Sequence, residues 1–514
     1  MTTNKIIVRA GRLVSAYDQP VIPGGAVAVS GNTIEAVGTY SEISSRHPDA
    51  AEIGGDQFLL LPGLINGHSH GRGLTDFQRG ALDNTLESWL LDTGKYIPVS
   101  TYDDIAFSAA RLLKSGITTT MDNHIVKDPI AYEKEFDETL QAYSDAGMRV
   151  QLNPAIRNDN PFVYGDNREF LASLPEGLRK VLTSTPPPDA LTGENFVDVV
   201  THLYKRCDSP MSRIGFGPLA PQWCTKELLL QVRKAADNLG RPINVHAAQS
   251  IFQKIYGLEF LGRSLIEYMN DIAFLGPGLV IGHCVWPTES DIELLAETHT
   301  GVTHHPSCNL RVRNGIAPVF HMLQAGVLVG LGLDGKSIND DDDIIQEMKV
   351  CFLLHRIPSL DLESPHLSAR QVFRMVTENN ASLLGYGDEL GRLEPGRFAD
   401  LVLLDYEKMS YPFVDPSQDP IDTLLYRGLG RHVDTVMVDG RVVVEKGRLL
   451  TLNEEAIGAR LAEAASRLRT EKQQALVKTM DELKNHVKRH YKGWTKRVDL
   501  TPYFNINSRG EKMK

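Results

Sequence analysis

Cysteine is scarce in this chain, with five residues in 514, and none of the five belongs to a closely spaced pair. A zinc-knuckle site or a disulfide framework would need such pairs, so neither organises this protein. Long apolar runs are also missing, and no stretch approaches the roughly 20 residues that cross a bilayer. No signal peptide is visible, because the first residues lead directly into a strand-like segment. We therefore expect a cytoplasmic protein with no membrane association.

An excess of positive charge is absent as well. The chain has 54 basic and 65 acidic residues, which gives a formal net charge of −11. This balance argues against general nucleic-acid binding and leaves a small molecule as the expected partner. Hydrophobic residues make up 42% of the chain, so a large catalytic domain with accessory parts can be built around a buried core.

Four histidines and one aspartate follow short aliphatic runs that are typical of buried parallel strands. In a (β/α)8 barrel the carboxyl ends of the strands converge on one mouth, where catalytic groups gather. Neutral imidazoles and a carboxylate brought together there are the ligands that Zn²⁺ or a similar divalent metal prefers. The sequence therefore predicts a metal site. The five residues are His68, His70, His246, His283 and Asp334.

The order of strand and helix patterns predicts three parts. Residues 61–384 alternate between strand-like and helical runs, as expected for a catalytic (β/α)8 barrel. Residues 1–60 and 385–452 contain short alternating strands, and we expect both chain ends to share one small β-sandwich. Residues 453–514 form a helical extension, in which apolar residues recur every three or four positions from Glu454 to about Val487. This stripe predicts packing onto the body or onto a second subunit, and we expect a homo-oligomer, a dimer or larger.

Several motifs in the same order resemble the amidohydrolase superfamily. Within it, the chain resembles the branch that holds triazine hydrolases, S-adenosylhomocysteine deaminases and guanine or cytosine deaminases. The motifs extend over most of the chain from about residue 5 to residue 450. They include Leu61–His70, Gly116–Thr120, Gly282–Val285, His304–Leu310, Leu331–Gly335 and Leu393–Val402.

The resemblance implies one divalent metal per chain, zinc first and iron, manganese or cobalt as alternatives. The fourth strand, Ile214–Pro221, has no lysine of the kind that other branches carboxylate to bridge two metals. The implied ligands are therefore those of a single metal. Asp334 would accept the proton of the attacking water, and His283 would be either a further ligand or a hydrogen-bond donor that stabilises the tetrahedral oxyanion. The implied metal ligands are His68, His70, His246 and Asp334.

One position departs from the family pattern. The deaminases carry a glutamate three residues after the fifth-strand histidine, whereas this chain has Gln249 after His246. A primary amide cannot shuttle a proton, so Gln249 is expected to bind substrate or backbone, and His304 or His124 could protonate the leaving nitrogen. The side chains expected around the substrate are Gln249, His304, His305, His124, Trp223 and Trp89.

These observations predict a metal-dependent hydrolase that cleaves a non-peptide carbon–nitrogen bond of a small molecule, in an amide, urea, carbamate or ring. One alternative is an aminohydrolase of a purine-, pyrimidine- or triazine-like heterocycle. A second alternative is a non-catalytic barrel that serves as a scaffold. The presence of all five candidate residues argues against it.

Overall fold

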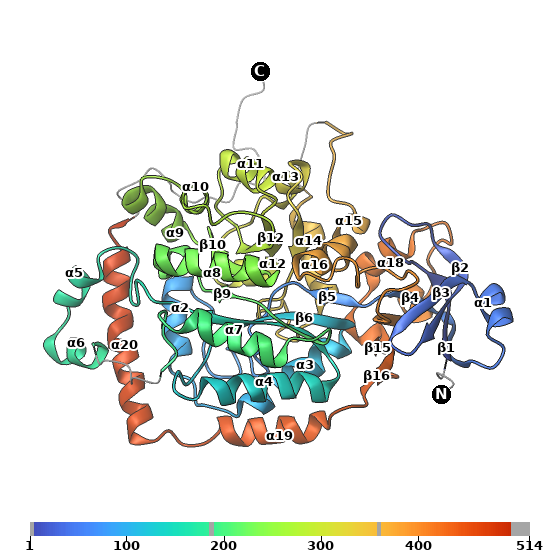
Figure 1. Ribbon diagram of the computed structural model, residues 1–514, viewed down its shortest axis with the longest axis horizontal. Helices are drawn as coiled ribbons and strands as arrows, with labels where there is room; N and C mark the ends of the chain where they lie inside the picture. The colour runs from blue at the N-terminus through green and yellow to red at the C-terminus, as the bar shows by residue number, and fades with distance from the viewer. Residues whose placement is uncertain (1–4, 184–189, 357–360, 495–514) are drawn as a thin grey trace.

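The computed structural model describes residues 5–183, 190–356 and 361–494 (Figure 1). Its centre is built from parallel strands, and helices follow them along the chain as the sequence alternation predicts. One parallel sheet runs β5–β6–β7–β8 with β9 beside β7, and a second runs β10–β11–β12–β13. The strands are β5 (Leu64–Asn66), β6 (Ile117–His124), β7 (Arg149–Ile156), β8 (Ser212–Ile214), β9 (Gly217–Pro218), β10 (Ile243–Ala247), β11 (Leu279–His283), β12 (Gly301–His304) and β13 (Val329–Leu331).

Backbone hydrogen bonds join the two parallel sheets. At one seam the Asn244 N–H donates to the Phe216 carbonyl at 2.8 Å, and at the other the Gly67 N–H donates to the Leu331 carbonyl at 3.0 Å. The strands thus follow one another around a (β/α)8 barrel, while regular ladder pairing stops at both seams.

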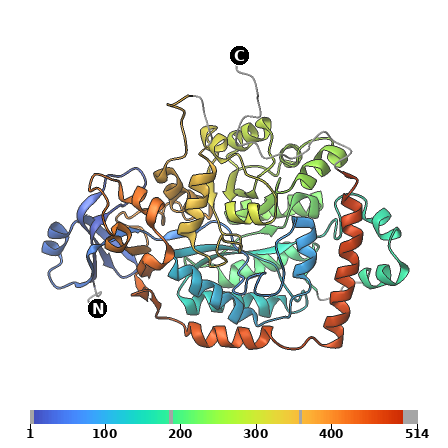
Figure 2. The ribbon, with the colours of Figure 1, turned by 180° about the vertical axis from the view of Figure 1, so that it is seen from behind.

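Helices cover the outside of the barrel strands (Figures 1 and 2). Their ends carry the expected signals: Ser100 caps α3 by accepting from the Asp103 N–H, and α8 begins after Thr225 and ends at Leu239, before Gly240, whose φ is 62°. The main barrel helices are α3 (Thr101–Lys114), α4 (Tyr132–Ala146), α7 (Phe196–Cys207), α8 (Lys226–Leu239), α10 (Leu265–Asp271), α11 (Glu289–Glu297), α13 (Val319–Gln324), α14 (Ile344–Leu354), α15 (Ala369–Met375) and α16 (Glu378–Leu383). The helices in the loops are α2 (Leu86–Thr93), α5 (Asn167–Ala172), α6 (Glu176–Leu182), α9 (Ile251–Tyr256) and α12 (Pro306–Arg311).

The two ends of the chain form one eight-stranded sheet beside the barrel, in the order β17–β16–β15–β14–β4–β1–β2–β3. The sequence predicted a sandwich, and the structure shows this continuous sheet. Its N- and C-terminal halves meet where β14 runs antiparallel to β4, with Leu403 opposite Leu60. The strands are β1 (Lys5–Leu13), β2 (Ile22–Ser30), β3 (Thr33–Thr39), β4 (Ala51–Pro62), β14 (Leu401–Asp405), β15 (Val433–Val438), β16 (Arg441–Glu445) and β17 (Arg448–Leu449). Helices α1 (Tyr40–Arg46), α17 (Tyr406–Ser410) and α18 (Pro420–Arg427) lie between these strands in the chain.

The C-terminal extension is two helices rather than one, α19 (Glu454–Ala465) and α20 (Glu471–Tyr491). Leu468, which the apolar spacing placed on the stripe, lies in the break between them and is 95% exposed. Helix α19 packs against α3, and α20 packs against α2 on the flank of the barrel (Figure 2). The extension therefore packs onto the body of the same chain. Residues 495–514 of the predicted extension lie outside the described residues.

The largest hydrophobic core fills the space between the barrel strands and their helices, and a smaller core joins α20 to the loops around Tyr164 and Trp223. In the described part of the chain, no helix is both long and apolar enough to span a membrane.

Candidate metal centre and substrate cavity

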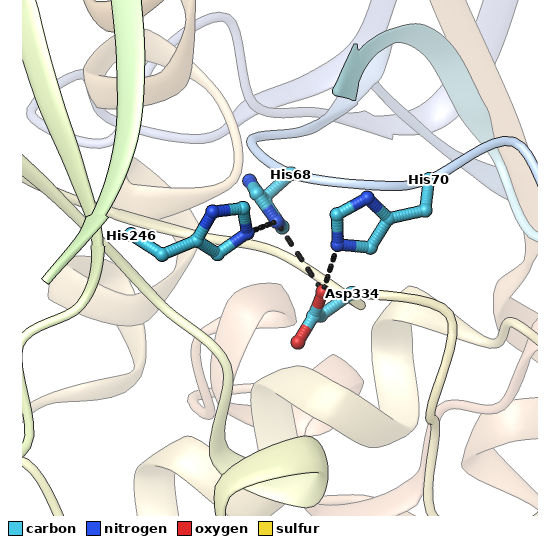
Figure 3. Close-up of side chains that lie close together, drawn as sticks. All are labelled: His68, His70, His246 and Asp334. Atoms are coloured by element: carbon cyan, nitrogen blue, oxygen red, sulfur yellow. Dashed lines mark hydrogen bonds and ion pairs between the residues drawn. The ribbon is translucent and has the colours of Figure 1, made fainter. Parts of the chain in front are cut away.

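Three imidazoles and one carboxylate meet at the carboxyl ends of the barrel strands (Figure 3). Asp334 Oδ1 lies 3.0 Å from His70 Nε2 and 3.3 Å from His68 Nε2. His246 Nε2 lies 3.1 Å from His68 Nε2. One ligand atom from each of the four residues lies within 4.8 Å of the others. The sequence-predicted ligand set is therefore one cluster in space.

Backbone hydrogen bonds and the contacts of the Nδ1 atoms orient these side chains. His68 and His70 lie in the loop after β5 rather than on the strand, and the Asp334 N–H donates to the His68 carbonyl at 3.0 Å. His70 Nδ1 contacts the Asn123 carbonyl at 2.9 Å, and His246 Nδ1 contacts the Leu219 carbonyl at 2.8 Å. A carbonyl oxygen can only accept, so both Nδ1 atoms carry the proton and both Nε2 lone pairs face the centre.

Close packing behind the cluster requires a glycine at position 332. A Cβ at Gly332 would lie 2.7 Å from the His68 backbone nitrogen and 2.9 Å from the His68 Cβ. Asp334 itself has a φ of 54°, in the left-handed region that non-glycine residues rarely adopt. Such a conformation persists only where its surroundings impose it, and it often marks a functional site.

The residues fit a divalent metal. Burial lowers the pKa of His68, and burial together with the neighbouring imidazoles lowers the pKa of His246 well below its usual range. Burial alone would raise the pKa of Asp334, but its contacts with His68 and His70 hold it well below the usual range. The donor set is thus three imidazoles with one carboxylate, and His246 Nε2 lies 3.1 Å from His68 Nε2. Imidazole nitrogens and a carboxylate oxygen gathered this closely are the ligands that Zn²⁺ prefers.

His283 completes the group from β11. Its Nε2 lies 3.7 Å from Asp334 Oδ2, and its Nδ1 lies 2.9 Å from Asn309 Oδ1. Asn314 also donates to Asn309 Oδ1, which identifies that atom as the oxygen, so His283 Nδ1 is the donor. Burial lowers the pKa of His283 to about 4 despite Asp334, and the ring is therefore neutral at pH 7. Nε2 then presents a lone pair, which favours the role of further ligand or proton acceptor over that of oxyanion donor.

A cavity of about 190 Å³ opens above the cluster. His70, His246, His283 and Asp334 form part of its wall, and the predicted substrate residues Trp89, Trp223 and Gln249 line it as well. The rest of the wall is mostly apolar, with two arginines. The remaining lining residues are Arg72, Leu86, Leu90, Thr93, Ile125, Arg157, Leu219, Cys308 and Val312.

His124 lies elsewhere than the sequence led us to expect. It ends β6 with its ring turned toward the helix layer, where its Nε2 lies 3.3 Å from Glu135 and its Nδ1 3.8 Å from Asp122. Burial lowers the pKa of His124, but these two carboxylates outweigh that effect and raise it to about 9. His124 is absent from the residues that line the cavity. It is a buried cation in an ion-pair group, away from the cavity wall.

His304 and His305 occupy opposite faces of the chain at the end of β12, as consecutive strand residues do. His304 points outward, where its Nε2 lies 3.2 Å from His355 Nε2 near Cys351. His305 points inward, stacks on His68 with ring centroids 4.5 Å apart, and lies 3.2 Å from His283 through its Nδ1. Neither residue lines the cavity. His305 packs against His68 and His283 on the side away from the cavity. His304 packs between the barrel and its helices.

Sequence reasoning missed several residues at this site. Arg72 and Arg157 line the cavity from the loops after β5 and β7, positions at which isolated arginines carry no pattern. Asn309 holds His283, and its place in the His304–Leu310 motif was a usable signal. Glu87 lies behind the wall, where it accepts from Ser250 Oγ at 2.5 Å, and burial raises its pKa.

The sequence pattern of the amidohydrolase family matches residues 59–443, and the chain belongs to this family. A bacterial imidazolonepropionase-like composite domain matches residues 25–50. Relatives include 5-methylthioadenosine/S-adenosylhomocysteine deaminase 1 of Syntrophus aciditrophicus, which is 30% identical over 458 residues and covers 87% of this chain and 94% of that protein. The 5'-deoxyadenosine deaminase of Methanothermobacter thermautotrophicus is 31% identical over 448 residues, or 86% of this chain and 94% of that protein.

Solved structures share the fold. An adenosine deaminase from Xanthomonas campestris with bound zinc superposes with a TM-score of 0.75 at 22% identity, over 92% of this chain and 98% of that one. Atrazine chlorohydrolase TrzN from Arthrobacter aurescens TC1, complexed with zinc, gives 0.74 at 24% identity, over 92% and 100%. The predicted (β/α)8 fold and the predicted class are confirmed: the protein is a metal-dependent hydrolase of carbon–nitrogen bonds other than peptide bonds. The scaffold alternative finds no support.

Proposed function

We propose that this protein holds one zinc ion through His68, His70, His246 and Asp334 and hydrolyses a carbon–nitrogen bond whose cleavage needs no proton from residue 249. Linear amides, ureas and carbamates, or rings with a good leaving group, meet that condition. The observation that carries the proposal is the set of residues that line the cavity. Gln249 stands on it, and Asp334 is the sole carboxylate among the described residues that line it.

When bound, a divalent metal supplies a Lewis acid that lowers the pKa of a coordinated water toward neutrality. Asp334 is placed to take the proton of the attacking water on Oδ2, because Oδ1 faces His68 and His70. His283 Nε2 lies 3.7 Å from that same Oδ2, so its lone pair can orient the water beside the carboxylate. Both groups act as acceptors at the start of the reaction.

The leaving nitrogen must regain a proton. His304 and His124 do not reach the cavity, and burial raises the pKa of the Cys308 thiol well above its usual range, which makes the thiol a poor acid. Asp334, having accepted a proton from the water, is the group on the wall that can return it. One carboxylate therefore acts first as base and then as acid.

Gln249 acts through its amide. The Gln249 N–H donates to Gln253 Oε1 at 2.8 Å, which fixes the turn after β10 and leaves the side chain on the cavity wall. Its side chain can donate or accept a hydrogen bond with substrate but has no proton to give up near neutral pH. The neighbouring carboxyl of Glu87 is engaged with Ser250 and is not on the wall.

A second candidate is deamination of an adenine nucleoside. It is supported by the names of the relatives, which are 30% and 31% identical over 87% and 86% of this chain. The two candidates differ in whether a ring nitrogen must be protonated while the amine leaves.

The test compares ammonia and amine release by the zinc-loaded parent protein, Gln249→Glu and the control Gln371→Glu. Gln371 is exposed, lies in the first turn of α15 and is absent from the cavity wall. The panel contains linear amides, ureas and carbamates beside 5'-deoxyadenosine and S-adenosylhomocysteine. We expect the parent and the control to act on linear compounds only, and Gln249→Glu to gain ring deamination. Deamination of either adenine nucleoside by the parent at ordinary enzymatic rates would replace the first candidate by the second.

A further inference from the structure

Arg157 is fixed at the edge of the cavity by the chain around it. It follows β7 directly, and the next two residues bind the opposite wall: the N–H groups of Asn158 and Asp159 both donate to the Trp223 carbonyl at 3.0 Å. These two hydrogen bonds connect the loop after β7 to the turn that contains Trp223. Arg157 and Trp223 consequently line the cavity together.

The guanidinium of Arg157 has no partner among the described residues. No hydrogen bond or ion pair to its side chain occurs within residues 5–183, 190–356 and 361–494, and no neighbouring charge acts on it. This distinguishes it from Arg72, the other arginine on the wall. Arg72 lies 3.7 Å from Asp76 and 5.6 Å above the Trp89 ring. Among the described residues, Arg157 is thus the arginine of the cavity wall whose side chain has no charged partner.

The charge balance of the cavity is positive. Two arginines line it, and its one lining carboxylate, Asp334, faces His68 and His70. A bound divalent metal would add further positive charge. Arg157 is exposed to solvent at this edge of the cavity, and a guanidinium there can bind a carboxylate or phosphoryl oxyanion through two of its N–H groups.

We propose that Arg157 binds an oxyanion of the substrate, a carboxylate or a phosphoryl group remote from the bond that is cleaved. The substrate is then an anionic small molecule, and Arg157 is a specificity-determining residue. This inference rests on the proposed function for the position of the reacting bond. It disfavours uncharged nucleosides, because they offer the Arg157 guanidinium no charged partner.

Binding by calorimetry tests the inference without turnover. The probes are linear alkyl hydroxamates, which chelate zinc, with two to six methylene groups and a terminal carboxylate, phosphonate or carboxamide. Each series is titrated into zinc-loaded parent protein, Arg157→Ala, Arg157→Lys and the control Arg168→Ala. Arg168 is an exposed arginine of α5 outside the cavity wall. The varied chain length finds the span from the metal site to the guanidinium.

We expect one anionic series to bind the parent more tightly than the carboxamide series and to lose at least ~10-fold in affinity in Arg157→Ala. Arg157→Lys should recover part of the loss, Arg168→Ala should match the parent, and carboxamide affinity should stay constant throughout. The better of the carboxylate and phosphonate series identifies the substrate's anion. Equal affinities of the anionic probes for the parent and Arg157→Ala would overturn the inference.

The same titration separates this inference from the proposed function. If no hydroxamate binds the zinc-loaded parent, the metal assignment fails, and glutarate is compared with glutaramide in the metal-free protein. Preference for glutarate that disappears in Arg157→Ala would support the anion site alone. Equal binding of the two compounds, or no binding of either, would contradict it.

Discussion

Replacing Asp334 by asparagine removes the group that serves first as base and then as acid. The carboxylate contacts His70 at 3.0 Å and His68 at 3.3 Å through Oδ1, and its Oδ2 faces His283 at 3.7 Å. An amide keeps the shape of the side chain, which matters because residue 334 has a φ of 54° and is 7% exposed. Asparagine tolerates that backbone conformation well, so the fold should survive.

The expected loss has two parts. An amide cannot accept the proton of the attacking water, and removal of a general base costs about 10²–10⁴-fold in kcat. The amide is also a weaker metal ligand than a carboxylate, so zinc affinity should fall. Because the same carboxylate returns the proton to the leaving nitrogen, we expect the loss in kcat at saturating zinc to lie at the upper end of that range.

The assay measures kcat at saturating zinc on the best substrate of the panel, beside the zinc content and the far-UV circular dichroism of each protein. Asp388→Asn is the matched control, since Asp388 lies in a turn away from the cavity. Near-normal kcat in a zinc-loaded, folded Asp334→Asn protein would show that the base is another group, and it would refute the proton transfer assigned to Asp334.

Two further predictions concern the surroundings of the site. The pKa of His124 is raised from 6.5 to about 9 by Asp122 and Glu135, which corresponds to on the order of 3 kcal/mol of unfolding free energy, present below about pH 6.5 and lost as the pH rises through 9. His124→Asn should therefore destabilise strongly at pH 6 and weakly at pH 10 in urea unfolding, and a constant difference across that range would contradict the ion-pair assignment. Tyr491 on α20 accepts the Tyr164 N–H at 2.9 Å, so Tyr491→Phe leaves a buried donor unpaired and should cost about 1–3 kcal/mol. An unchanged urea midpoint would show that the hydrogen bond from Tyr164 to Tyr491 of α20 does not stabilise the fold.

The barrel and the metal cluster could be predicted from the sequence for one physical reason. Parallel strands buried on both faces read as continuous aliphatic runs, and their carboxyl ends share one edge, so the sequence pattern alone places residues such as His246 and Asp334 together. The contacts of the neighbouring histidines could not be assigned in this way. The ends of β6 and β12 were predicted, but His124 and His304, which the sequence placed around the substrate, point toward the helices instead.

Loops and tertiary packing account for the rest. Arg157 lies in a loop without periodicity, and its place on the wall depends on hydrogen bonds from the next two residues to Trp223, which is distant in the sequence. The break in the C-terminal helix was also hidden, because the apolar spacing continues through Leu468, which is left exposed between α19 and α20. Spacing alone cannot reveal which members of a stripe find a surface to cover.

The metal content of the purified protein tests the central claim most directly. The chain is stripped with a chelator, titrated with zinc and measured by elemental analysis and by hydrolysis of the best substrate. We predict that activity rises in proportion to the first equivalent of zinc per chain and is complete at one, and that His246→Ala abolishes tight binding. Two tightly bound equivalents that are both needed for activity would contradict the single site of His68, His70, His246 and Asp334.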